Sequence, residues 1–157
     1  MSDTHAKSVI RIGLDDTDHV EYACTTEHFN RLLNRLMESI DSFEILERRL
    51  VRLWPFAPKR TRRNAALSAI CRTDTTNLIY FESICQEFME DLHKEILGSY
   101  PDTGQKPSPR LIIATEEVPE SLYWKAVRGE VSLETALAKL PQSTKIYSIQ
   151  ENPNGIV

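Results

Sequence analysis

Apolar and polar residues follow two different periods along the first forty residues of the chain. Residues 8–14 alternate between apolar and polar and are rich in β-branched side chains, which predicts a strand. The next apolar positions recur at i, i+3, i+4, i+7, i+8 and i+11, which predicts one face of an amphipathic helix with Thr25 or Thr26 as its N-cap. These positions are Phe29, Leu32, Leu33, Leu36, Met37 and Ile40.

The same two periods predict the rest of the elements. Short apolar runs predict four further strands, at residues 43–54, 63–71, 110–114 and 145–149. Helical spacing predicts a second long helix over residues 81–96 and two short helices over residues 120–127 and 132–140. Residues 98–109, with three prolines and two glycines, are predicted to form a loop.

The resulting order is β-α-β-β-α-β-α-α-β. Strands that follow one another without an intervening helix argue against a doubly wound parallel sheet. We therefore expect an α/β or α+β fold in which a mixed β-sheet is sandwiched with the two long amphipathic helices. A chain of 157 residues is long enough for one compact unit or for two small lobes that share a core.

Composition narrows the class of protein. Hydrophobic residues make up 41% and charged residues 27% of the chain, and no apolar run approaches the roughly 20 residues of a membrane helix. The polar N-terminus does not resemble a signal peptide, so a cytoplasmic location with no membrane partner is expected. The three cysteines (Cys24, Cys71 and Cys85) have neither disulfide nor zinc spacing and are expected to be free thiols.

Charge is segregated along the chain although its net value is only −4. The segment from Arg48 to Arg63 contains seven basic residues and no acidic one, so it predicts a local surface that attracts anions. The basic residues are Arg48, Arg49, Arg52, Lys59, Arg60, Arg62 and Arg63.

Three carboxylates and a hydroxyl follow the first predicted strand, at Asp15-Asp16-Thr17-Asp18. Adjacent carboxylates repel one another, and a hard cation such as Mg²⁺ relieves that repulsion. Ligands of α/β proteins also bind beyond the carboxyl ends of strands. The alternative is a solvated turn closed by the Asp or Thr side chains. Thr25, at the start of the next helix, is interpreted as an N-cap, a phosphate ligand or a phosphorylation site.

The basic loop that follows Pro58 has three interpretations. It is a triphosphate clamp that faces the acidic turn, a surface that binds the RNA backbone, or a charged strand edge that discourages aggregation. Trp54 and Phe56 beside it are interpreted either as base-stacking residues or as core. His19 is the one histidine placed for chemistry, as a general base, although a surface position is favoured for it.

Four blocks of sequence, in order, resemble archaeal tRNA(Ile) agmatinylcytidine synthetases. The blocks are Ile12-Gly13-Leu14-Asp15-Asp16-Thr17-Asp18, Cys24-Thr25-Thr26, Arg49-Leu50-Val51-Arg52-Leu53 with Pro55 and Pro58, and Lys59-Arg60-Thr61-Arg62-Arg63-Asn64-Ala65. The family has G-I-D-D-T-D, C-T-T, R-L-x-R-L-N-P and K-T-R-G-N-G-A at the corresponding places. Here Arg63 and Ala65 replace the two glycines of the last block, and Arg60 is an additional residue.

The resemblance implies an ATP- and magnesium-dependent, kinase-like module that activates the wobble cytidine of an isoleucine tRNA, an ATP-dependent tRNA-modifying ligase where the chain is active. It implies catalytic roles for Asp15, Asp16 and Thr25, with Thr25 as the phosphorylated threonine. It also implies a magnesium site at Asp15, Asp16 and Asp18. The implied nucleotide-binding residues are Thr17, Asp18, Thr26, Lys59, Thr61, Arg62 and Asn64.

The resemblance also divides the chain. Residues 1–62 correspond to part of the kinase-like region, residues 63–149 to a ferredoxin-like half, and residues 150–157 form a tail. The family continues beyond this point into domains that hold tRNA. The chain is therefore interpreted as a fragment or a shortened paralogue, with a second chain as the expected source of the missing domains.

Two rival functions are considered. The first is a non-catalytic RNA- or partner-binding module that uses Arg48, Arg49, Arg52, Arg60 and Arg63. The second is an aspartate-nucleophile phosphatase, because Asp16-Thr17-Asp18-His19-Val20 fits the pattern D-x-D-x-[T/V].

Overall fold

A five-stranded sheet is the centre of the fold in the computed structural model, which describes residues 5–19, 21–58, 64–101 and 107–149. The strand order is β2-β3-β1-β4-β5, and every neighbouring pair is antiparallel. The strands are β1 (Lys7–Asp15), β2 (Glu44–Arg52), β3 (Ala65–Asp74), β4 (Arg110–Ala114) and β5 (Lys145–Ser148).

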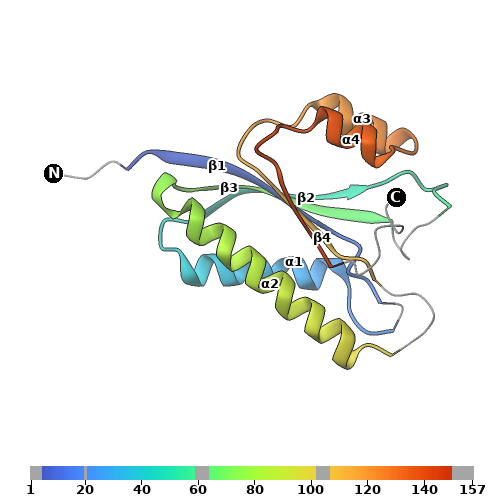
Figure 1. The fold of residues 1–157 in the computed structure, drawn as a ribbon, viewed down its shortest axis with the longest axis horizontal. Coiled ribbons are helices and arrows are strands. Elements are labelled where there is room, and N and C mark those ends of the chain that lie inside the picture. The colour runs from blue at the N-terminus through green and yellow to red at the C-terminus, as the bar shows by residue number, and fades with distance from the viewer. Residues whose placement is uncertain (1–4, 20, 59–63, 102–106, 150–157) are drawn as a thin grey trace.

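Four α-helices flank this sheet. The two long helices, α1 (Thr25–Ser39) and α2 (Leu78–Ser99), lie side by side on one face, and a short 3₁₀ helix (Thr75–Asn77) leads into α2. The two short helices, α3 (Glu120–Arg128) and α4 (Leu133–Lys139), connect β4 to β5 and lie on the opposite side (Figure 1).

The predicted α+β class and element order are confirmed. The mixed sheet is corrected, because β3 is inserted between β1 and β2 and runs antiparallel to both. The β-α-β-β-α-β arrangement of ferredoxin-like folds runs from β1 to β4, so it includes strands of the predicted first half. Strands from both predicted halves belong to one sheet, and the division at residues 62 and 63 stays a prediction.

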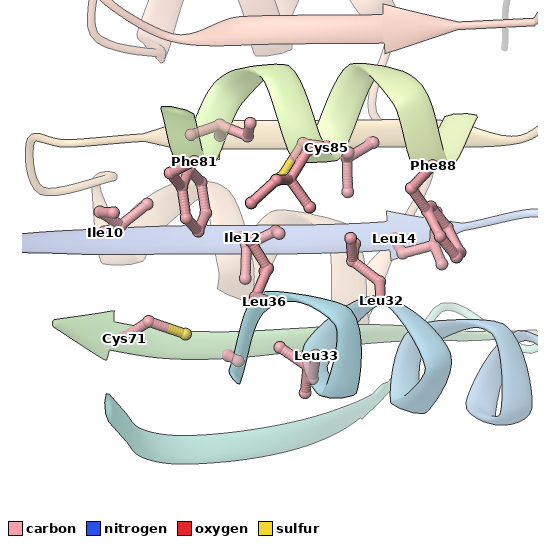
Figure 2. Close-up of a cluster of buried hydrophobic side chains, with 14 of the residues drawn as sticks. Ile10, Ile12, Leu14, Leu32, Leu33, Leu36, Cys71, Phe81, Cys85 and Phe88 are labelled. Atoms are coloured by element: carbon pink, nitrogen blue, oxygen red, sulfur yellow. The ribbon is translucent and has the colours of Figure 1, made fainter. Parts of the chain in front are cut away.

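The hydrophobic core lies between the sheet and the two long helices (Figure 2). Alternate residues of β1 (Ile10, Ile12 and Leu14) are buried against the helices, as a period of two requires. Phe81 and Phe88 fill the space under α2, and neither side chain is more than 2% exposed. This packing fixes which end of each element lies near the acidic turn.

The start of α1 differs from the sequence prediction by one residue. Cys24 is the N-cap and provides no side-chain hydrogen bond, whereas Thr25 is the first helical residue. Met37, which the periodicity placed on the apolar face, is 42% exposed. At α4 the prediction is confirmed, because the Ser132 side chain accepts a hydrogen bond from the Thr135 amide.

All three cysteines are free, as expected, and Cys71 and Cys85 are buried. Within the part of the chain that the structure describes, no helix is long and apolar enough to cross a membrane.

Candidate functional site

The ends of five segments meet at one end of the sheet. They are the end of β1, the start of α1, the end of α2, the start of β4 and the connection from β2 to β3 (right-hand side of Figure 1). The acidic turn, residues 15–18, is therefore placed at the same end of the sheet as the basic connection. Arg52 and Asp15 are on strands separated by β3, so their backbones are about 10 Å apart at two strand spacings.

Asp15 and Asp16 are neighbouring carboxylates that are both partly withdrawn from solvent. Burial raises the pKa of Asp15 to about 6, and the nearby charge of Asp18 adds to this. Burial, followed by the charge of Asp15, likewise raises the pKa of Asp16 to about 6. The hydrogen bond from the Asp16 amide to Asp15 Oδ1 (2.7 Å) opposes the shift at Asp15 without cancelling it. The pair is thus costly to ionise without a cation.

Arg110 supplies positive charge to this pair. It begins β4 and is in register with Asp15 across the β1–β4 ladder. Its guanidinium lowers the pKa of both Asp15 and Asp16, but less than burial raises them. Arg110 was not among the residues selected from the sequence, because only strand pairing brings β4 beside β1.

Asp18 connects the acidic turn to the first residue of α1. Its Oδ1 accepts hydrogen bonds from the Thr25 amide (2.5 Å) and from the Thr25 hydroxyl (2.8 Å). A carboxylate at a helix N-terminus satisfies a free amide and interacts favourably with the helix dipole. Asp18 therefore supplies the cap that Cys24 does not, and Thr25 is only 3% exposed, whereas Thr26 is exposed.

Thr17 is fully buried, and its hydroxyl contacts the protein interior. Thr17 Oγ1 and His28 Nδ1 are joined by a hydrogen bond of 2.8 Å, and His28 Nε2 is joined to the Tyr100 hydroxyl by one of 3.0 Å. Glu95 Oε1 lies 3.8 Å from His28 Nε2, and Arg31 holds Glu95 with two hydrogen bonds. Burial lowers the pKa of His28, so its neutral form is favoured.

His19 is buried, which corrects the favoured surface position. Its Nδ1 accepts a hydrogen bond from the Glu21 amide, so Nε2 carries the proton and donates to the Pro101 carbonyl oxygen at 3.0 Å. The His19 ring also packs edge-on against Tyr100, with ring centroids 5.2 Å apart. His19 thus attaches the acidic turn to the segment that follows α2.

The donor chemistry at Asp15 and Asp16 fits a magnesium ion that also binds phosphates. Mg²⁺ commonly takes one or two protein carboxylates and completes its shell with water and phosphate oxygens. Among the described residues no group of three His, Cys, Asp or Glu side chains is arranged to hold a metal ion. Asp18 Oδ1 is already occupied by Thr25, which leaves Asp15 and Asp16 as the better-placed ligands.

The basic side of the predicted site is only partly described. Lys59, Arg60, Thr61, Arg62 and Arg63 lie outside the described residues. Asn64 has a left-handed backbone (φ 43°), and its Nδ2 donates to the Trp54 carbonyl oxygen at 2.5 Å, which closes the base of the β2–β3 connection. Arg52 is exposed at the end of β2.

Arg48 and Arg49 are on opposite sides of β2. Arg48 donates to Asn30 Oδ1 of α1, whereas Arg49 pairs with Glu47 and is close enough to Tyr123 of α3 to interact with it electrostatically. Successive residues of a strand face opposite ways, so the predicted RNA surface is not one continuous face.

His28 and Tyr100 were missed by the sequence analysis, although His28 left a signal. It lies next to Phe29 on the otherwise apolar face of α1, where a polar residue must find buried partners. Tyr100 left none, because its contact with residue 28 depends on the packing of α1 against α2.

The family model of the TiaS TCKD domain matches residues 11–151. The 2-agmatinylcytidine synthetase TiaS of Caldivirga maquilingensis, an enzyme named for its isoleucine tRNA, is 28% identical over 137 residues, which are 87% of this chain and 31% of that protein. The protein of the same name from Ignisphaera aggregans is 38% identical over 104 residues, 61% of this chain and 22% of that protein. The chain thus spans about a third or less of the length of these curated relatives.

Solved structures give a similar result. A complex of TiaS with its isoleucine tRNA and ATP superimposes with a TM-score of 0.70 at 21% identity, over 92% of this chain and 33% of that one. Apo TiaS superimposes with a TM-score of 0.68 at 20% identity, over 91% of this chain and 32% of that one. At these identities the likeness shows a shared fold.

Proposed function

The chain belongs to the TiaS TCKD domain family, and on that premise we propose that it is an ATP- and magnesium-dependent, kinase-like module that takes part in tRNA modification in the cytoplasm. The observation that supports this most is the placement of the Asp15–Asp16 pair beside the capped start of α1. A cation between the pair and a nucleotide phosphate offsets the cost of ionising both carboxylates.

Each residue has a stated part in this proposal. Asp15 and Asp16 hold magnesium, which neutralises phosphate charge when bound. Arg110 limits the net negative charge near the phosphates. Lys59, Thr61, Arg62 and Asn64 grip phosphates from the basic connection, and a second chain supplies the tRNA-holding domains that this length of chain does not cover.

Phosphorylation of Thr25 is part of the same proposal. The 2.8 Å hydrogen bond places Asp18 Oδ1 to take the hydroxyl proton as Thr25 Oγ1 forms a bond to the γ-phosphorus of ATP. The bond from that phosphorus to the β–γ bridging oxygen breaks, and ADP leaves. We expect incubation with Mg·ATP to add about 80 Da to the peptide that contains Thr25, and Thr25→Val to abolish that addition in intact-mass and peptide mass spectra.

Binding of labelled ATP tests the proposed function directly. The unaltered chain is expected to bind ATP in the presence of Mg²⁺ and at least about tenfold more weakly with EDTA, because removing charge compensation costs on the order of 1.4 kcal/mol or more. Asp15→Ala and Asp16→Ala should each remove the magnesium dependence. Asp41→Ala, in the exposed turn after α1, is the matched control. Magnesium-independent or undetectable binding contradicts the proposal.

A non-catalytic RNA-binding module is the second candidate, supported by an aromatic and basic surface around α3. Phe56 is 74% exposed beside Trp54, and Arg128 stacks over Trp124 at 4.8 Å. A hydrogen bond from the Trp54 amide to the Ala126 carbonyl oxygen joins the two parts. This candidate predicts RNA affinity that falls steeply with salt and does not respond to ATP. The phosphatase alternative is weakened, because Asp18 is committed to Thr25.

A further inference from the structure

A histidine with no exposed surface lies directly beneath the acidic turn. His28 is 0% exposed, and each ring nitrogen has a hydrogen-bond partner, Thr17 at one end and Tyr100 at the other. Buried polar groups are stable only when they are paired in this way, and a chain of paired groups holds its members in one arrangement. The three residues come from three segments that are distant in the sequence.

The acidic turn needs such an anchor because its backbone is strained. Asp16 has a left-handed conformation (φ 56°), which costs a non-glycine residue about 1 kcal/mol or more. The next residue is Thr17, whose hydroxyl is held by His28. A restraint on Thr17 therefore acts on the backbone between the Asp16 and Asp18 carboxylates.

The far end of the chain of hydrogen bonds is itself fixed. Tyr100 is the C-cap of α2, and its ring packs against His19, which follows the acidic turn. Glu95 and Arg31 tie α2 to α1 beside the same histidine. His28 thus joins the acidic turn to the packing of the two long helices.

We propose that His28 is a positioning residue for the nucleotide site, acting through Thr17 to hold Asp15 and Asp16 in the arrangement that binds Mg·ATP. His28 does not touch the nucleotide. The proposal rests on the proposed ATP- and magnesium-dependent function and adds to it a residue that acts from beneath the site.

Calorimetric titration with Mg·ATP is the first test. Thr17→Val and His28→Leu break the link to the turn and are expected to weaken Mg·ATP binding about tenfold, the scale of one buried hydrogen bond. Thr17→Ser keeps the hydroxyl and should bind within about twofold of the unaltered chain. His28→Asn keeps an amide group near the Nδ1 position and should recover most of the affinity. Tyr100→Phe, a milder change that leaves His28 in place, should weaken binding about threefold.

Loss of stability alone must not produce the same result. Ile84→Val, in the core under α2, is the control, because it destabilises the fold by about 1 kcal/mol without contacting the chain of hydrogen bonds. It should bind Mg·ATP as the unaltered chain does.

Amide hydrogen exchange in the chain without magnesium or nucleotide is the second test. The Asp16 amide, which donates to Asp15 Oδ1, should exchange about tenfold faster in Thr17→Val and His28→Leu, but not in Ile84→Val. Equal affinity and equal exchange in all variants overturn the positioning role alone, while Mg·ATP binding by the unaltered chain upholds the proposed function. If the unaltered chain does not bind Mg·ATP, both are overturned.

Discussion

The carboxyl group of Asp15 gives the protein a pH dependence that can be measured without any ligand. Its pKa is raised from 3.8 to about 6 by burial. The folded state therefore keeps a proton between these values that the unfolded state loses, so the free energy of unfolding falls as pH rises through this window. The loss persists above pH 6, where both states are ionised.

Asp15→Asn should remove this cost while keeping an acceptor for the Asp16 amide. In magnesium-free buffer we expect its free energy of unfolding to exceed that of the unaltered chain by about 2 kcal/mol at pH 8 and to equal it near pH 4. Urea unfolding at the two pH values measures the difference, with Asp41→Asn as the exposed control. A gain that is the same at both pH values would contradict a burial cost of ionisation.

Asp18 has a structural role that its place in an acidic motif does not reveal. Because it caps α1 through the Thr25 amide and hydroxyl, Asp18→Ala should lower the free energy of unfolding by about 1–2 kcal/mol with or without magnesium. Asp18→Asn, which retains the acceptor, should lose less. Urea unfolding with and without Mg²⁺ checks this, and a loss seen only with magnesium would assign Asp18 to the metal instead.

At the scale of elements, α2 shows how strongly one helix face determines stability. Phe81 is completely buried at the start of the helix, whereas Ile79, two residues earlier, is 83% exposed. Phe81→Ala should therefore cost about 3–5 kcal/mol, whereas Ile79→Ala should change the free energy of unfolding by less than about 0.5 kcal/mol. Urea unfolding of both variants measures the contrast. A similar loss in both would mean that the exposed side of α2 is also packed.

Local periodicity predicted nearly every helix and strand, because each element buries one face and so carries its own pattern. The strand pairing did not follow, since the insertion of β3 between β1 and β2 depends on contacts across some fifty residues of chain. The same limit applied to the site. Asp15, Asp16 and Thr25 were visible as a motif, while Arg110 and Tyr100 reach it only through strand pairing and helix packing.

At the scale of the whole molecule, the helical connection between β4 and β5 is separable from the core. No residue of α3 or α4, both wholly within the described residues, is fully buried, and a hydrogen bond from Trp54 to Ala126 links α3 to the β2–β3 connection. The strands on either side of this connection are already neighbours, with Ile113 opposite Lys145. A short hairpin turn is therefore sufficient to join them.

Replacing residues 116–143 with Asn-Gly-Ser should leave a folded protein. We expect its free energy of unfolding to change by less than about 1 kcal/mol, because little apolar burial is lost and a shorter connection costs less entropy to close. The shortened chain should bind Mg·ATP within about twofold of the full chain, since the acidic turn lies at the far end of β4 from the cut. RNA affinity that depends on Trp124 and Arg128 should disappear. Calorimetry with Mg·ATP and filter binding with RNA, on the same preparation, thus separate the two candidate functions. Loss of cooperative unfolding, with the full chain as the control, would show instead that α3 and α4 are integral to the fold.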